Sequence, residues 1–109
     1  MRVTVMMLTV CLGMAAVAGA QDAKVTKGQQ LFADQKCTLC HSIADKGNKK
    51  GALDGVASKI SADDMRAWLT DAKSMTAKTK ATRKPEMKAF TLPKADVDAL
   101  VAYLQTLKK

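Results

Sequence analysis

Apolar residues recur at helical spacing in residues 25–35. Val25, Gly28 and Phe32 share one face at i, i+3 and i+7, with Leu31 beside them. The pattern predicts a helix over this range. A glycine inside a helix is less favourable than an alanine by about 1 kcal/mol. We therefore expect a second helix to pass close to Gly28.

Two further helices are predicted, each behind a recognisable start signal. Residues 61–64, Ser-Ala-Asp-Asp, resemble a capping box ahead of an amphipathic stripe. Pro93 suits the first position of the last helix, because its missing N–H costs nothing there. The middle helix has the stripe Met65, Trp68, Leu69 and Ala72, and the last helix has Val97, Leu100, Val101 and Leu104, extended by Tyr103 and Leu107.

The segments between these helices have the composition of loops. Residues 42–60 hold three glycines and four lysines, with Leu53 and Val56 as apolar anchors. Residues 73–88 are rich in Lys and Thr and form the most basic part of the chain. No stretch alternates with period two over the length of a strand. We therefore expect an all-α domain of three to four helices with long loops.

The first twenty residues have the pattern of a secretory signal. Arg2 precedes a mostly apolar, uncharged run at residues 3–17, and residues 18–20, Ala-Gly-Ala, suit a signal peptidase. A membrane anchor is the alternative, but the run is shorter than the roughly 20 residues that a spanning helix needs. We expect cleavage before Gln21, which would also remove Cys11.

Cleavage leaves one small domain over residues 21–109. It keeps 17 of the 18 basic residues and all ten acidic ones, for a formal charge of +7. Domains of this size often need a metal, a disulfide or a ligand to stabilise them. The four aromatic residues are few for a self-sufficient core, so a large apolar prosthetic group would fill a need.

Candidate chemistry is concentrated in residues 37–41, Cys-Thr-Leu-Cys-His, the spacing of c-type haem attachment. Cys37 and Cys40 can each form a thioether to a haem vinyl group. His41, the only histidine of the chain, can then bind the iron. A zinc site would need four ligands, and a thioredoxin-like pair would accompany a βαβ pattern. A disulfide would leave His41 unexplained, so we predict one covalently bound haem c.

The sixth ligand of the iron must come from another residue, and a thioether sulfur is suitable. Met65 lies on an apolar helical stripe and is expected in the core. Met75 and Met87 both fall in the predicted basic loop. Pro85 stiffens the approach to Met87, so we favour Met87, with Met75 as the open alternative.

The mature chain resembles a small class I c-type cytochrome of bacteria over almost all of residues 24–108. The matching residues are Gly28-x-x-Leu31-Phe32, Cys37-x-x-Cys40-His41, Leu53-Asp54-Gly55, Trp68-Leu69, Pro85-Glu86-Met87-x-x-Phe90 and Leu100-Val101-Ala102-Tyr103-Leu104. The resemblance implies a cytochrome c-like fold around one haem c. It also implies thioethers to Cys37 and Cys40 and axial ligation of the iron by His41 and Met87.

The resemblance also assigns structural roles. Gly28 and Phe32 would cross the last helix near Leu100 and Tyr103, and residues 68–69 would line the haem pocket. In this family a proline carbonyl usually accepts the hydrogen bond of the ligand imidazole.

The chain departs from the family in three places. The spacing from Phe32 to Cys37 is one residue longer than in many relatives. The position of that proline is Gly51, whose carbonyl is still available, and we expect a looser support for His41. The stretch between Trp68 and Met87 is also long, which leaves Met75 as an alternative sixth ligand.

These features predict a soluble, periplasmic one-electron carrier and not an enzyme, because His41 and Met87 would fill both axial positions. Residues 73–88 would border the haem edge and steer a redox partner with an acidic surface. We expect a monomer without nucleic acid or stable membrane insertion. The alternatives are a haem c subunit of a larger redox enzyme and a ligand sensor or small peroxidase-like protein with a labile distal methionine.

Overall fold

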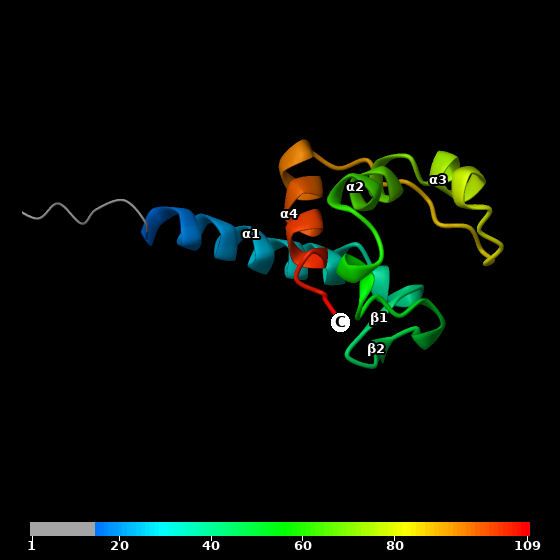
Figure 1. Cartoon of the computed structure of the whole chain (residues 1–109), viewed down its shortest axis with the longest axis horizontal. Coiled ribbons are helices and arrows are strands. Elements are labelled where there is room, and N and C mark those ends of the chain that lie inside the picture. Colours follow the sequence, from blue (N-terminus) through cyan, green and yellow to red (C-terminus); the bar gives the residue numbers. More distant parts are fainter. Residues whose placement is uncertain (1–14) are drawn as a thin grey trace, which may run out of the picture.

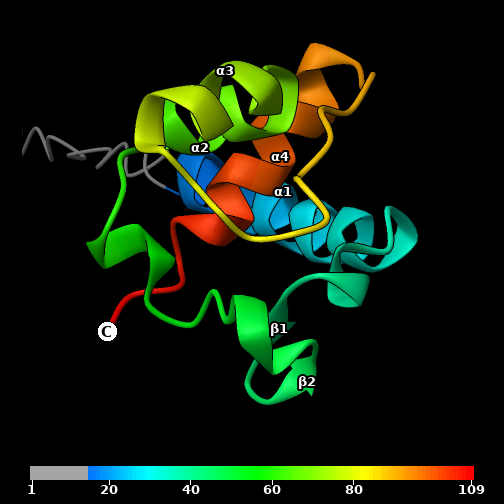
Figure 2. The same ribbon diagram turned by 90° about the vertical axis from the view of Figure 1, so that its right-hand side faces the viewer.

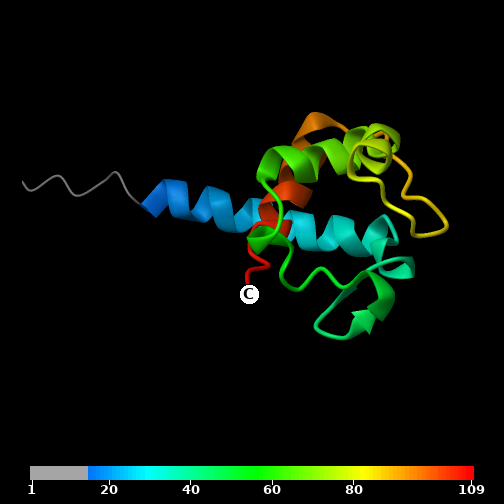
Figure 3. The ribbon, with the colours of Figure 1, turned by 45° about the vertical axis from the view of Figure 1, so that its right-hand side comes forward.

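A computed structural model describes residues 15–109 of the protein (Figure 1). The predicted all-α class is confirmed, with one two-stranded antiparallel ladder added to the helices. The elements are α1 (Ala15–Asp34), β1 (Ser42–Ile43), β2 (Lys46–Gly47), α2 (Ala62–Thr70), α3 (Ala72–Thr79) and α4 (Lys94–Leu104). In Figures 1, 2 and 3, α1 lies between the pair α2–α3 and the ladder β1–β2.

Helix α1 begins ten residues before the predicted start at Val25. The reason is the alanine-rich stretch at residues 15–23, because alanine has the highest helix propensity. Most of the predicted signal peptide, including Cys11, lies outside the described residues, and the rest forms the start of α1. Cleavage before Gln21 therefore stays a prediction.

The expected close approach at Gly28 is confirmed. Gly28 is buried, and a Cβ atom there would overlap the carbonyl group of Ala99 and lie 2.7 Å from Cβ of Tyr103. One turn later, the rings of Phe32 and Tyr103 meet edge to face, with centroids 6.0 Å apart and an interplanar angle of 69°. The absence of a side chain at residue 28 therefore lets α1 and α4 cross at backbone distance.

We predict that Gly28→Val will strongly destabilise the fold, because the α4 backbone and Tyr103 Cβ cannot move aside without a large cost in free energy. The expected loss is about 2–3 kcal/mol of unfolding free energy, as for other overpacked sites. Urea unfolding followed by far-UV circular dichroism would measure it. Gln29→Val, on the exposed face of the same helix, is the control and should change the midpoint little. Equal midpoints for the two variants would contradict the crossing.

The core lies where α1, α2 and α4 meet, and Met65 is in it with 2% of its surface exposed. This confirms the interpretation of Met65 as a core residue. The predicted apolar stripe of the last helix is also buried. The core cluster consists of Phe32, Met65, Leu69, Val97, Leu100, Val101 and Leu104.

The cap predicted for the middle helix is present, but the helix is shorter than expected. The hydroxyl of Ser61 accepts a hydrogen bond of 3.1 Å from the backbone N–H of Asp64. Helix α2 then ends at Thr70, because Asp71 leaves the helical conformation at φ −147° and ψ 54°. Ala72, assigned to the same stripe in the sequence, is instead the first residue of α3 and is fully buried.

The prediction of a loop over residues 73–88 was wrong in its first half, where α3 is a helix. Ala, Lys and Met are good helix formers, so these residues need few large apolar groups to be helical. Lys80 ends α3 in a left-handed conformation, φ 54° and ψ 39°, and its N–H bonds to the last turn. This ending uses lysine in place of the usual glycine, so the sequence carries no clear stop signal there.

The loop predicted over residues 42–60 contains more order than expected. Ala44 and Asp45 both have positive φ, 51° and 64°, and turn β1 back onto β2. Two 3₁₀ helices follow, at Lys49–Gly51 and Val56–Ser58. Two-residue strands are too short to show an alternating pattern, which is why the sequence did not reveal them.

An ion-pair group joins α2 to α4. Asp98 pairs with Arg66 of α2 and, at 3.0 Å, with Lys94 of its own helix. The hydrogen bonds from Lys94 and Arg66 hold the pKa of Asp98 below its ordinary value. The ionised carboxylate of Asp98 thus stabilises the folded state at pH values above the ordinary pKa of an aspartate. This contribution is lost as the pH falls through the lowered pKa.

We predict that Asp98→Asn will lower the urea midpoint at pH 7 and that its difference from the unmodified protein will shrink below about pH 4. Urea titrations at pH 7 and pH 3 would measure the two differences. The exposed Asp22→Asn, outside any ion pair among the described residues, is the control and should show no such convergence. A pH-independent difference for Asp98→Asn would contradict the role of the pairs.

Candidate haem site

The haem-attachment motif forms a tight turn directly after α1. Lys36 adopts the left-handed conformation at φ 57°, which ends the helix and starts a 3₁₀ turn at Cys37–Leu39. The N–H of His41 donates to the carbonyl of Cys37 at 2.9 Å and closes the turn. Cys37 is half-buried against the core, and Cys40 is exposed. Both are free thiols, so the disulfide alternative is not formed in this structure.

Burial is the main cause that raises the pKa of Cys37 to about 11, with the neighbouring Cys40 thiol contributing less. The thiol of Cys37 is therefore neutral at physiological pH in the folded polypeptide. A neutral sulfur against the apolar core is compatible with a thioether at the same position.

His41 is held by one defined hydrogen bond. Its Nδ1 lies 2.9 Å from the carbonyl oxygen of Gly51, which can only accept, so Nδ1 carries the proton. The other ring nitrogen, Nε2, then keeps its lone pair for a metal. Burial lowers the pKa of His41, the hydrogen bond to Gly51 opposes this, and the charge of Arg83 adds to it. His41 is therefore a neutral imidazole whose Nε2 is available to a metal.

Asn48 joins the attachment turn to the loop that supports His41. Its backbone N–H donates to the carbonyl groups of Thr38 and His41, both at 3.1 Å. Its side-chain oxygen accepts from the N–H of Lys50 at 3.1 Å and starts the 3₁₀ turn that ends at Gly51. A polar residue ahead of a short turn is the signal that could have identified it.

Gly51 packs directly under the motif. A Cβ atom at this position would overlap the carbonyl oxygen of Cys40 and the guanidinium of Arg83, and would lie 3.0 Å from His41 Nδ1. The expected looser support is not seen, because the imidazole bond has ordinary length and the space beside the glycine is filled.

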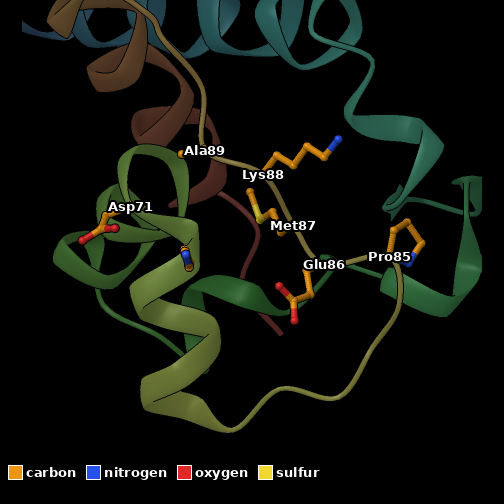
Figure 4. A pocket seen from close by; sticks show the side chains of 7 residues that line it. Asp71, Pro85, Glu86, Met87, Lys88 and Ala89 are labelled. Carbon is orange, nitrogen blue, oxygen red and sulfur yellow. The ribbon is translucent and has the colours of Figure 1, made fainter.

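Met87 lies on the extended segment between α3 and α4. It is half-buried against the core and lines a pocket of about 480 Å³ together with Pro85 and Lys88 (Figure 4). Three residues later, the N–H of Phe90 donates to the carbonyl of Leu69 at 2.8 Å, which fixes the segment to α2. Met87 therefore lies three residues from a fixed point of the chain and beside a pocket.

A second pocket, of about 740 Å³, adjoins the first at Pro85. It lies between the attachment turn, represented by Leu39 and Cys40, and residues 82–85. The segment that carries Met87 thus faces the turn that carries the two thiols. The structure thus brings Cys40 and the segment that leads to Met87 onto neighbouring surfaces, whereas Cys37 and His41 line neither pocket.

Met75 has a different environment from the one predicted. It lies in α3, not in a loop, and only 6% of its surface is exposed. It lines neither of the two pockets, whereas Met87 lines one. Of the two methionines, Met87 is therefore the more accessible one. Leu69 is in the core and Trp68 is half-buried, and neither lines these two pockets, so their place beside the haem stays a prediction.

Comparison with known protein families shows which family this chain belongs to. The family model Cytochrome c matches residues 25–108, most of the chain. The chain is a member of the cytochrome c family. Its cofactor is accordingly haem c, covalently attached, and its role is electron carriage. No curated protein and no solved structure gave a match.

The residues of the candidate site in this cytochrome c fit a covalently bound haem c. The turn supplies two thiols at the attachment spacing, and Gly51 leaves Nε2 of His41 as the free nitrogen. Haem iron, when bound, exchanges one electron between Fe(III) and Fe(II). Within residues 15–109, no three or more His, Cys, Asp and Glu side chains gather as a metal site. No helix in that same range is long and apolar enough to cross a membrane.

Proposed function

We propose that this cytochrome c is an exported, soluble one-electron carrier whose iron is held by His41 and Met87. The observation that carries the proposal is the 2.9 Å bond from His41 Nδ1 to Gly51, which presents the other nitrogen as a fixed ligand. Met87, which lines a pocket, would supply a thioether as the second iron ligand. Cys37 and Cys40 are the proposed thioether positions.

Electron exchange without catalysis follows from this ligand set. With His41 and Met87 as its ligands, the iron would have no position open to a substrate. Both ligands sit on segments fastened by backbone hydrogen bonds, through Asn48 and Phe90. A ligand set held in this way changes little with oxidation state, and an apolar surrounding disfavours the extra charge of the oxidised form.

The partner we propose has an acidic docking surface. The six basic residues of 73–88 are all exposed, and Glu86 is the only acid in that range. Glu86 is engaged by Lys84 at 2.8 Å, so it neutralises only one of these charges. A surface of one sign accelerates association with a surface of the opposite sign. The basic residues are Lys73, Lys78, Lys80, Arg83, Lys84 and Lys88.

Export to the periplasm is proposed from the N-terminal pattern of residues 1–20. The mass of the protein recovered from the periplasm tests it. We expect a mature chain that begins at Gln21 and carries one haem. Recovery of the full-length chain in the membrane fraction would instead support an anchor.

Carbon monoxide binding and size-exclusion chromatography of the purified protein test the carrier function. We expect the reduced protein to be unreactive with carbon monoxide, because Met87 occupies the distal position. We also expect it to elute as a monomer. Ready carbon monoxide binding would favour a sensor or peroxidase-like protein. Co-elution with other redox subunits would favour a component of a larger enzyme.

A further inference from the structure

The guanidinium of Arg83 lies against Gly51, although it belongs to the opposite side of the site. Arg83 Nη1 is the nearest atom to the space that a Gly51 side chain would fill, and Cys40 O and His41 Nδ1 are the next two. Arg83 and Cys40 also line the same 740 Å³ pocket. Arg83 therefore reaches from the segment that leads to Met87 across to the loop that supports His41.

The charge of Arg83 is uncompensated in this position. Within the part of the chain that the structure describes, it has no carboxylate at ion-pair distance. Its neighbour Lys84, in contrast, is paired with Glu86. Arg83 also has a planar head that can pack flat against a backbone, which a lysine cannot do.

Gly51 is the structural partner that admits this side chain. Any Cβ atom at residue 51 would occupy the volume of the guanidinium. The glycine therefore provides a carbonyl for His41 on one side and a gap for Arg83 on the other. Loss of the gap would push the positive charge away from the imidazole.

We propose that Arg83 is a positioning residue that bridges the segment leading to Met87 and the loop that supports His41, and that it raises the reduction potential of the haem iron, with Gly51 as the gap that admits it. The inference rests on the proposed function, because it concerns the same His41 and Met87 ligation. A fixed positive charge disfavours the more positive Fe(III) state. Arg83 is exposed, so solvent and salt screen its effect and keep it moderate.

Redox titration of the haem-loaded mature protein and three variants tests the inference. We expect Arg83→Gln to lower the equilibrium constant for reduction by about threefold to tenfold, tenfold being 59 mV for one electron. Lys78→Gln, with the same change in net charge on an exposed turn of α3, is the control and should shift the potential clearly less. Arg83→Lys should restore only part of the difference. Equal shifts for Arg83→Gln and Lys78→Gln would overturn the inference.

A double-mutant cycle with Gly51→Ala tests the role of the gap. If alanine acts by displacing Arg83, it should lower the potential of the unmodified protein but have a smaller effect in the Arg83→Gln background. The contact with the Cys40 carbonyl is present in both backgrounds, so it cancels in the cycle. Additive shifts would overturn the role of Gly51.

These experiments distinguish a failure of the proposed carrier function from a failure of the proposed role of Arg83. If the unmodified protein lacks the methionine–iron absorption band or a reversible one-electron couple, both the proposed function and the Arg83 inference are overturned. If the unmodified protein shows both, but Arg83→Gln behaves as Lys78→Gln does, only the Arg83 inference is overturned.

Discussion

Met87→Leu is expected to abolish the methionine–iron charge-transfer band of the oxidised protein. Leucine keeps the volume of methionine, so the segment should stay packed against the core while its sulfur is lost. The reduction potential should fall by on the order of 100 mV, because axial ligands set haem potentials over a span of ~0.8 V. Visible spectroscopy and a redox titration would measure both changes.

Met75→Leu is the matched control for that experiment. It makes the same exchange at a buried position of α3 that lines neither pocket. A volume-conserving change of this kind usually lowers stability by less than about 1.5 kcal/mol, so the protein should fold and keep the band. Loss of the band in Met75→Leu and its retention in Met87→Leu would reassign the sixth ligand to Met75.

Replacing both thiols, in Cys37→Ser/Cys40→Ser, is expected to remove covalent haem attachment completely. Acidified acetone should then extract all haem from the variant and none from the unmodified protein. Folding should suffer as well, because a small domain draws much of its stability from a bound group. Haem staining of denatured protein and circular dichroism would record the two losses.

The two single variants should differ in stability. Cys37 is half-buried against the core, so Cys37→Ser also places a hydroxyl beside apolar groups, whereas Cys40 is exposed. We expect Cys37→Ser to be the less stable of the two. Thr38→Ala, between the cysteines, is the control and should keep the haem. Retention of covalent haem by the double variant would contradict the assignment of these two residues.

The haem motif and the helix crossing could be predicted from the sequence because each depends on residue types at fixed local spacing. Two cysteines and a histidine at residues 37–41 have few chemical uses together. Gly28 within an apolar helical face had an energetic reason to meet another helix. The structure confirmed that meeting through Ala99 and Tyr103.

The second half of the site could not be predicted in the same way, since it depends on contacts between distant segments. Residues 72–79 lack a strong apolar stripe, so the sequence predicts a loop around Met75 where the structure has α3. The contact of Arg83 with Gly51 spans 32 residues of sequence and leaves no local pattern. Asn48 is one polar residue among several in residues 42–60, and only the structure shows that its hydrogen bonds join the attachment turn to the loop that supports His41.

The central claim is that this protein carries electrons on a haem c whose iron is bound by His41 and Met87. A redox titration of the purified protein, with visible spectra at each potential, tests it most directly. We predict a c-type spectrum, the methionine–iron band in the oxidised form, and a single reversible one-electron transition with the same ligands on both sides. A spectrum without that band, or a ligand change between the two oxidation states, would contradict ligation by His41 and Met87.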